Sequence, residues 1–143
     1  MGACTPRLGA RYPVHVEVFA ANRVVIVAAG IGARAPLRFS SGRLVGAHCY
    51  GALVTLDPTG VVQVRSGARL SIRDLFLAWR QPLSSSRLGP FRARPGTSVD
   101  AFVDGRQWRG PPGTVPLTSH AEIVLEVGPH VPPHTSYTFA PGS

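Results

Sequence analysis

The feature that most limits the fold of this chain is a series of short apolar runs bounded by glycine and proline. In residues 14–19, three valines alternate with His15, Glu17 and Phe19, and a period of two is typical of a β-strand with one apolar face. Residues 24–27 are apolar at every position, which predicts a buried strand, and Ala21-Asn22 can turn the chain between the two. The pattern therefore predicts a fold made mostly of short strands.

Two turn sequences divide the later strands. Asp57-Pro58-Thr59-Gly60 suits a type I turn, because proline presets φ and the aspartate can accept bonds from the following backbone N–H groups. Asp104-Gly105 is a strong hairpin signal. Strands are expected over residues 53–56, 61–65, 98–103 and 122–127, with a short return from the second turn toward Trp108.

One helix is predicted from Ser71 to about Arg80. Ser71 and Asp74 have the spacing of a capping box, in which the third residue of the helix bonds back to the residue that begins it. The apolar positions follow the period of a helix with one buried face: Ile72, Leu75, Phe76 and Trp79. Pro82 ends the helix.

About seven short strands and one helix predict an α+β, β-dominated single domain. A β-grasp-like arrangement, with a curved mixed sheet holding the helix, satisfies that count, and so does a flattened barrel. We place the domain at residues 12–128, between a loose N-terminal segment (1–11) and a Pro/His-rich C-terminal tail (129–143) that lies across the body or frays. A chain of 143 residues can bury a core without a disulfide or a structural metal.

The composition excludes several classes of protein. Apolar residues are 44% of the chain and charged residues 15%, which excludes general disorder, and no apolar run approaches the ~20 residues of a membrane span. All 15 basic residues are arginine, for a net charge of +8. Because a GC-rich codon bias explains this choice of basic residue, we do not expect a nucleic-acid partner. The absence of lysine excludes Schiff-base and P-loop chemistry.

Two cysteines do not make a disulfide framework. Cys4 lies in the segment expected to be loose, so no structural bridge to Cys49 is predicted. The first eleven residues lack the basic start and apolar stretch of a signal peptide. The chain is therefore predicted to be cytoplasmic and reduced.

The reactive side chains offer two candidate clusters and no known catalytic signature. His15 and Glu17 share one face of the first strand, and a carboxylate beside a histidine can hold the imidazole pKa near neutrality, as acid–base catalysis requires. His48-Cys49-Tyr50 is the densest reactive cluster. Each also has a structural interpretation: a half-exposed pair for the first, and a small core residue for Cys49.

Several segments occur in an order that is similar to a group of small uncharacterised actinobacterial His-rich domains. They are Val14–Phe19, Val27–Gly32, Cys49-Tyr50, Asp57–Val62, Ser71–Gln81 and Val115–Ile123, within residues 12–139. The resemblance implies a His-x-His pair on the first strand and a His-Thr-His-Asp segment before the first turn, as an imidazole-based metal site would need.

This chain departs from that pattern at the implied ligand positions. Pro13 stands at the first histidine of the pair, and Val54-Thr55-Leu56 replaces His-Thr-His, whereas His15, Cys49, Asp57 and His120 remain. Loss of these ligands removes most of the affinity for a divalent ion. A concave site that has lost its ligands is expected to be an apolar small-molecule pocket, with no metal and no cofactor.

The leading hypothesis is a cofactor-independent protein that binds a small, largely apolar organic molecule, as an acid–base, cyclase- or isomerase-type enzyme of bacterial specialised metabolism. His15, Glu17 and His48 are the candidate catalytic residues. The candidate substrate-binding residues are Cys49, Tyr50, Val54, Leu56 and His120.

Two other classes stay open. One is a copper or zinc protein that uses His15, His48, Cys49 and His120 as ligands. The other is a non-catalytic interaction module whose arginines bind an acidic partner or nucleic acid. No membrane association is expected, and a homodimer is left open.

Overall fold

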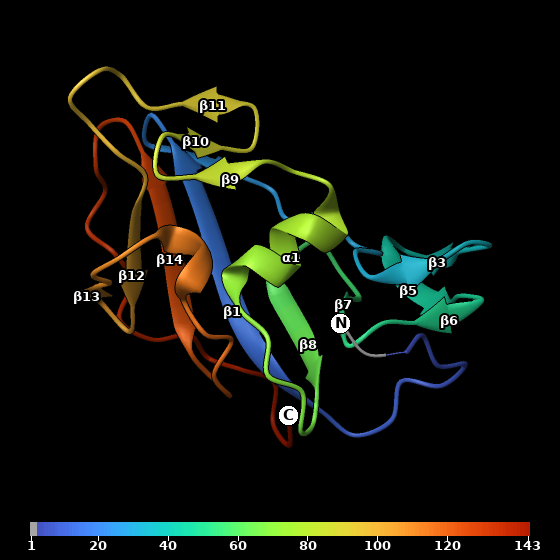
Figure 1. Cartoon of the computed structure of the whole chain (residues 1–143). Helices are drawn as coiled ribbons and strands as arrows, with labels where there is room; N and C mark the ends of the chain where they lie inside the picture. The colour runs from blue at the N-terminus through green and yellow to red at the C-terminus, as the bar shows by residue number, and fades with distance from the viewer. Residues whose placement is uncertain (1–2) are drawn as a thin grey trace.

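A mixed sheet of seven strands organises the molecule, which the computed structural model describes over residues 3–143. Six strands follow the order β13-β12-β14-β1-β8-β7, and β2 pairs with the free part of β1 (Figure 1). Their bounds are β1 Arg11–Ala20, β2 Arg23–Val25, β7 Leu53–Thr55, β8 Val61–Arg65, β12 Asp100–Val103, β13 Arg106–Gln107 and β14 Glu122–Val127. The sheet is open at β13 and β7, so the flattened-barrel alternative is wrong.

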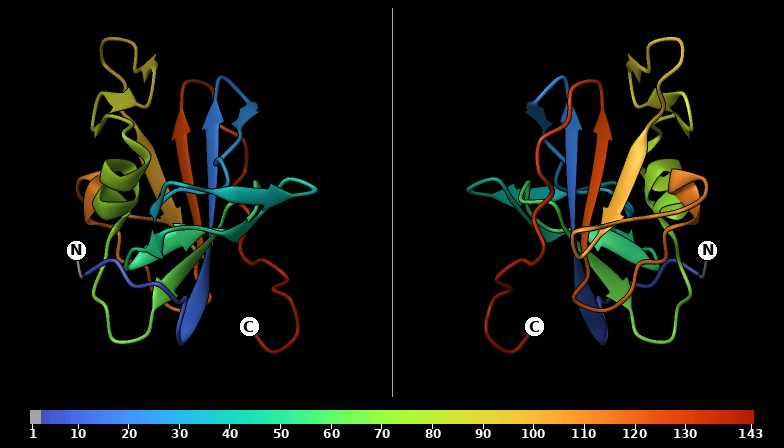
Figure 2. Two further views of the ribbon diagram at one scale, coloured as in Figure 1. Left: turned by 90° about the vertical axis from the view of Figure 1, so that its right-hand side faces the viewer. Right: turned by 90° about the vertical axis from the view of Figure 1, so that its left-hand side faces the viewer.

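The central strands β1 and β14 are parallel, and the other pairs of the sheet are antiparallel. Helix α1 (Ile72–Trp79) follows β8 in the chain and packs on one face of the sheet (Figure 2). A mixed sheet that holds one helix is the β-grasp-like arrangement, and it confirms the predicted β-dominated α+β class.

The helix begins and ends as its sequence predicts. Asp74 accepts a hydrogen bond from the backbone N–H of Ser71 at 2.8 Å, and Arg80 ends the helix in the left-handed conformation. Ile72, Leu75 and Phe76 are buried against the valines of β1 that face the same way. This side of the sheet forms the main hydrophobic core.

Two segments between the strands of the main sheet form small sheets of their own. Residues 33–50 contain β3 (Ala33–Arg34) paired with β6 (Cys49–Tyr50) and β4 (Arg38–Ser40) paired with β5 (Arg43–Gly46). Residues 82–97 contain a three-stranded sheet of β9 (Leu83–Ser84), β10 (Arg87–Leu88) and β11 (Phe91–Arg92). A 3₁₀ turn, η1 (Pro112–Thr114), precedes β14.

The buried strand expected over residues 24–27 is wrong. Only β2 (Arg23–Val25) forms, at an edge of the sheet, and Val24 and Ile26 are 61% and 65% exposed. Val27 alone of the run is fully buried. The strand ends early because the chain leaves β1 after three paired residues.

The predicted absence of a disulfide is also wrong: Cys4 and Cys49 are bonded. The N-terminal segment is held by the body, because Thr5 and Tyr50 exchange two backbone hydrogen bonds of 2.9 and 2.6 Å. That pairing brings Cys4 next to β6, which the sequence around Cys4 does not signal. The prediction of a reduced chain fails with it, and the cytoplasmic location that depended on it is left without support.

The C-terminal tail (residues 129–143) lies across the face of the sheet opposite the helix (Figure 2). It has no regular secondary structure, and it is held to the sheet by side-chain contacts and by a hydrogen bond of 2.8 Å from the backbone N–H of Val131 to the Glu126 carboxylate. Among residues 3–143, no helix is long and apolar enough to span a membrane.

Candidate functional site

The sheet face covered by the tail carries all three glutamates of the chain, Glu17, Glu122 and Glu126. Period two places them there: the odd-numbered residues of β1 and the even-numbered residues of β14 point away from the helix. Glu122 and Glu126 are each 1% exposed. Because buried carboxylates need partners, this face is where the chemistry of the molecule is concentrated.

His15 and Glu122 form a buried pair at the centre of that face. They are register partners in the parallel β1–β14 ladder, and Nδ1 of His15 lies 2.9 and 3.2 Å from the two carboxylate oxygens of Glu122. Nε2 of His15 donates to the carbonyl oxygen of Thr59 at 2.9 Å. Both imidazole nitrogens are therefore bonded within the protein.

A glycine makes the Thr59 contact possible. Gly60 has a φ of +85°, and a Cβ there would lie 2.4 Å from the carbonyl oxygen of Val16. The Asp57–Gly60 turn can thus pack directly on β1, between the parts of β1 that pair with β8 and with β2. This places the Thr59 carbonyl within hydrogen-bond distance of His15. The type I turn predicted from the sequence has this second role.

Burial raises the pKa of the Glu122 carboxyl, and its hydrogen bond and charge interaction with His15 oppose that rise. The neighbouring Glu17 carboxylate adds to the rise by like-charge repulsion. His15 thus favours the charged form of a carboxyl group that burial and Glu17 disfavour.

Two tail residues complete this cluster. Nδ1 of His134 lies 2.7 Å from a carboxylate oxygen of Glu17, and this hydrogen bond, with the charge of Glu17, raises the pKa of the His134 imidazole. The ring of Tyr137 stacks on His15 with centroids 3.6 Å apart and planes 13° from parallel. The tail thus covers His15.

A second acidic pair lies further along the same face. Nε2 of His130 lies 2.8 Å from Asp100 and Nδ1 lies 3.7 Å from Glu126. Oε2 of Glu126 is buried without a hydrogen bond to any residue that the structure describes. The two tail histidines, His130 and His134, thus each lie beside a glutamate of the sheet.

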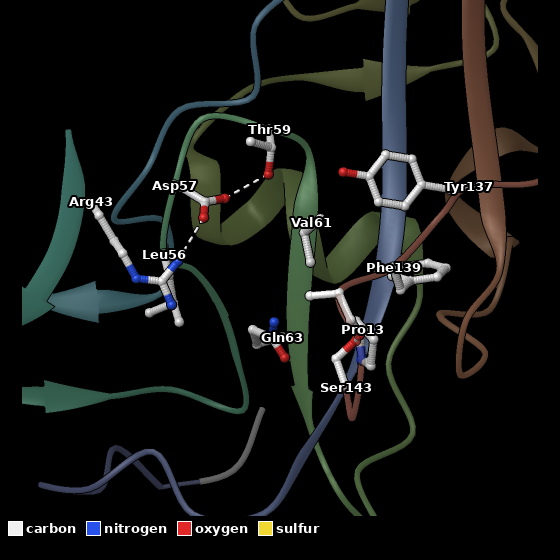
Figure 3. Close-up of a pocket in the computed structure, with 11 residues that line it drawn as sticks. Pro13, Arg43, Leu56, Asp57, Thr59, Val61, Gln63, Tyr137, Phe139 and Ser143 are labelled. Atoms are coloured by element: carbon white, nitrogen blue, oxygen red, sulfur yellow. Dashed lines mark hydrogen bonds and ion pairs between the residues drawn. The ribbon is translucent and has the colours of Figure 1, made fainter. Parts of the chain in front are cut away.

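A cavity of about 340 Å³ opens beside Tyr137. Figure 3 shows Tyr137 and Phe139 of the tail on one side, Arg43 and Asp57 on the other, and Gln63 between them. Its apolar lining comes from Pro13, Leu56, Val61, Tyr137, Phe139 and Ala140. Arg43 and Asp57 form an ion pair of 2.7 Å across its rim, and Thr59 joins the pocket to the Asp57–Gly60 turn.

The residues predicted to share one pocket are distributed over the molecule. Leu56 lines the cavity, and its neighbour Val61 is the register partner of His15, so Leu56 and His15 lie on the same sheet face. His15 itself is separated from the cavity by Tyr137. Val54 also points to this face but is fully buried in a second small core with Leu44 and Tyr50, because the segment that contains β4 and β5 covers it.

The remaining predicted residues lie away from both His15 and the cavity centre. His48 is exposed, Cys49 is held in the disulfide and Tyr50 packs in the second small core, so this segment offers no free thiol. His120 bonds Ser119 and the Ser143 carbonyl at the end of the tail. It contacts Phe139 edge-on, at the margin of the cavity.

Sequence reasoning missed Glu122 and Tyr137 as partners of His15 and His134 as the partner of Glu17. Glu122 stood out only as one of seven acidic residues, and nothing local shows that its strand pairs with residues 11–20. His134 was interpreted as a tail residue. The period of β14, with acidic residues at 122 and 126 on one face of an otherwise apolar strand, was the available signal.

No protein-family model, no curated protein and no solved structure matches this chain. Function is therefore argued from the geometry of the two sites, the buried His/Glu cluster and the cavity beside it.

Proposed function

We propose that this protein binds a small, largely apolar organic molecule that carries a hydroxyl or carbonyl group. The observation that carries the proposal is the cavity beside Tyr137, whose volume of about 340 Å³ lies in the range of small-molecule sites. Aromatic and aliphatic side chains form most of its lining. Gln63 adds an amide, which can both donate to and accept from such a group.

The resemblance to the His-rich group supports the same proposal. Pro13 and Leu56, at two of the positions where that group carries histidines, both line this cavity. A site that once held an ion and now has proline and leucine in place of ligands would keep its concave shape and lose its polarity. An apolar ligand suits such a lining.

An acid–base step by His15 is a further part of this proposal that the present contacts support less directly. His15 lies behind the ring of Tyr137, and Glu122 and Thr59 occupy its two nitrogens. Proton transfer to a ligand would require Tyr137 to move aside and the Glu122 bond to open. The geometry therefore favours binding, because catalysis would require both of these movements in addition.

Binding can be tested by protein-observed NMR with a set of one- and two-ring alcohols and ketones, 2-naphthol among them. We expect saturable shifts of the amide signals of Val61, Gln63 and Tyr137. Leu56→Trp should abolish them, because the larger ring fills the cavity. Leu77→Trp, on the exposed face of the helix (61% exposed), is the matched control and should leave binding unchanged.

The proposal fails if the whole set produces no saturable shifts at these positions, or if Leu56→Trp binds as well as the unmodified protein. Conversion of a bound ligand, lost in His15→Gln, would support the acid–base step. Binding without conversion would support the simpler proposal alone.

A further inference from the structure

We propose that His15, Glu17 and Glu122 form a binding site for one divalent transition-metal ion, with Zn²⁺ and Mn²⁺ the ions that its donors suit. One ligand atom from each of the three lies within 4.8 Å of the other two. An imidazole nitrogen with two carboxylates is a donor set that both ions accept. The site is distinct from the apolar cavity, so this inference goes beyond the function proposed above.

The backbone brings the three donors together. His15 and Glu17 are two residues apart on β1 and so point to the same face of the sheet. Glu122 lies directly opposite His15 in the parallel ladder. All three side chains therefore rise from neighbouring positions of the two central strands, which pair over His15–Ala20 and Glu122–Val127.

The hydrogen bond to Thr59 prepares His15 as a ligand. Because Nε2 donates to the Thr59 carbonyl at 2.9 Å, the nitrogen turned toward Glu122 is Nδ1. Histidines that bind metals commonly donate their other ring N–H to a backbone carbonyl or a carboxylate, which fixes the ring and its tautomer. Gly60 contributes to the same arrangement, because it allows the turn that carries the Thr59 carbonyl to approach β1.

Glu17 has an outer partner of the same kind. His134 bonds one carboxylate oxygen of Glu17 at 2.7 Å and leaves the other oxygen for an ion. Carboxylates that bind metals are in turn hydrogen-bonded by such partners. We assign His134 as a positioning residue that acts through Glu17 and belongs to the C-terminal tail rather than to the sheet.

The charges of the cluster suit a divalent cation. Two carboxylates with a neutral imidazole carry a charge of −2. Glu17 belongs to β1 and Glu122 to β14, and the opposite face of each strand packs into the apolar core. Like charges this close repel each other strongly when they are withdrawn from water. A divalent ion would balance both carboxylates at once, whereas in its absence Glu122 is paired with His15 and Glu17 with His134 of the tail.

The sequence predicted no metal because Val54 and Leu56 occupy positions where the resembling group has histidines. The site proposed here needs neither position. It uses His15, which the chain shares with that group, together with two glutamates and a tail histidine. The earlier expectation therefore concerned a different set of ligands.

The test is titration of the full chain, without a histidine tag, with Zn²⁺ by calorimetry and with Mn²⁺ by NMR line broadening. We expect one Zn²⁺ per chain, and Mn²⁺ broadening centred on the amides of His15, Glu17 and Glu122. Glu17→Gln and Glu122→Gln should each weaken Zn²⁺ binding at least about tenfold, since loss of even an outer partner weakens metal affinity 10–100-fold.

Three further variants make the assignment specific. His134→Ala should weaken binding by a similar factor, and His134→Gln, which can still donate to Glu17, should restore part of it. His130→Ala, a matched tail histidine that pairs with Asp100 and Glu126, and Leu56→Trp should both leave Zn²⁺ binding unchanged. Circular dichroism melts establish that each variant is folded.

The inference is overturned if neither ion binds, or if binding is lost with His130 or His48 and kept with Glu17→Gln, since the ions would then be held by exposed histidines. The Mn²⁺ line broadening is measured on the unmodified protein, so it does not depend on whether any variant folds. If Glu122→Gln does not fold, Glu17→Gln and that broadening decide the question. Loss of ligand binding in Leu56→Trp with Zn²⁺ binding retained would separate this site from the proposed small-molecule function.

Discussion

At the scale of single residues, the central feature is a buried histidine that is hydrogen-bonded at both ring nitrogens. His15 is 5% exposed, bonded to Glu122 and Thr59, and covered by Tyr137. The sequence left two interpretations open, a half-exposed His15–Glu17 pair or a catalytic histidine held near neutrality by Glu17. In the structure Glu17 instead pairs with His134, and the partner of His15 comes from the last strand.

The energetic consequence can be measured with His15→Ala. This variant leaves the Glu122 carboxylate buried without its partner, and removal of one member of a buried pair costs about 3–5 kcal/mol. His15→Leu combined with Glu122→Leu should cost much less, because no unpaired charge remains. Urea unfolding measures both. Equal losses in the two variants would mean that packing, and not the charge, determines the cost.

At the scale of elements, local signals predicted well and distant contacts did not. The helix from Ser71, the Asp57–Gly60 turn and the strand Glu122–Val127 follow from spacing within a few residues, and the structure has each of them. The prediction of a buried strand at residues 24–27 is wrong because the burial of a strand depends on which elements pack beside it. The grouping of the site residues could not be predicted for the same reason. His15, Glu122 and His134 come from three segments that no local pattern connects.

The tail is the element whose attachment should depend on pH. Glu17 raises the pKa of His134, so this contact is fully present below the unfolded histidine value of about 6.5 and is lost as the pH rises through the raised folded value. In metal-free protein, amide exchange of residues 134–139 should therefore quicken at alkaline pH. Glu122 also faces His134 electrostatically and favours the same protonated form.

The control for this prediction is His134→Gln, in which the tail contact cannot titrate. Exchange of the tail in that variant should follow only the intrinsic chemical dependence on pH. If the two proteins show the same dependence, Tyr137 and not His134 determines how the tail is held.

At the scale of the whole molecule, the disulfide joins the N-terminal segment to the small sheets. The two cysteines are 45 residues apart, and a cross-link that closes a loop of this length stabilises a domain by typically about 2–4 kcal/mol. Cys4→Ser combined with Cys49→Ser should lower the free energy of unfolding by that amount and leave the main sheet intact. A complete loss of folding would show that residues 3–10 are part of the core.

The pairing of β1 with β14 also determines when during synthesis this protein can fold. The two strands at the centre of the sheet come from opposite ends of the chain, and His15 and Glu122 are 107 residues apart. Contacts of such long range are formed late and slowly. Until the last strand emerges from the ribosome, β1 presents one bare edge, which is the kind of edge that recruits other chains. We therefore expect products truncated before residue 122 to aggregate, and expect the nascent chain to depend on chaperones until residues 122–127 have been made.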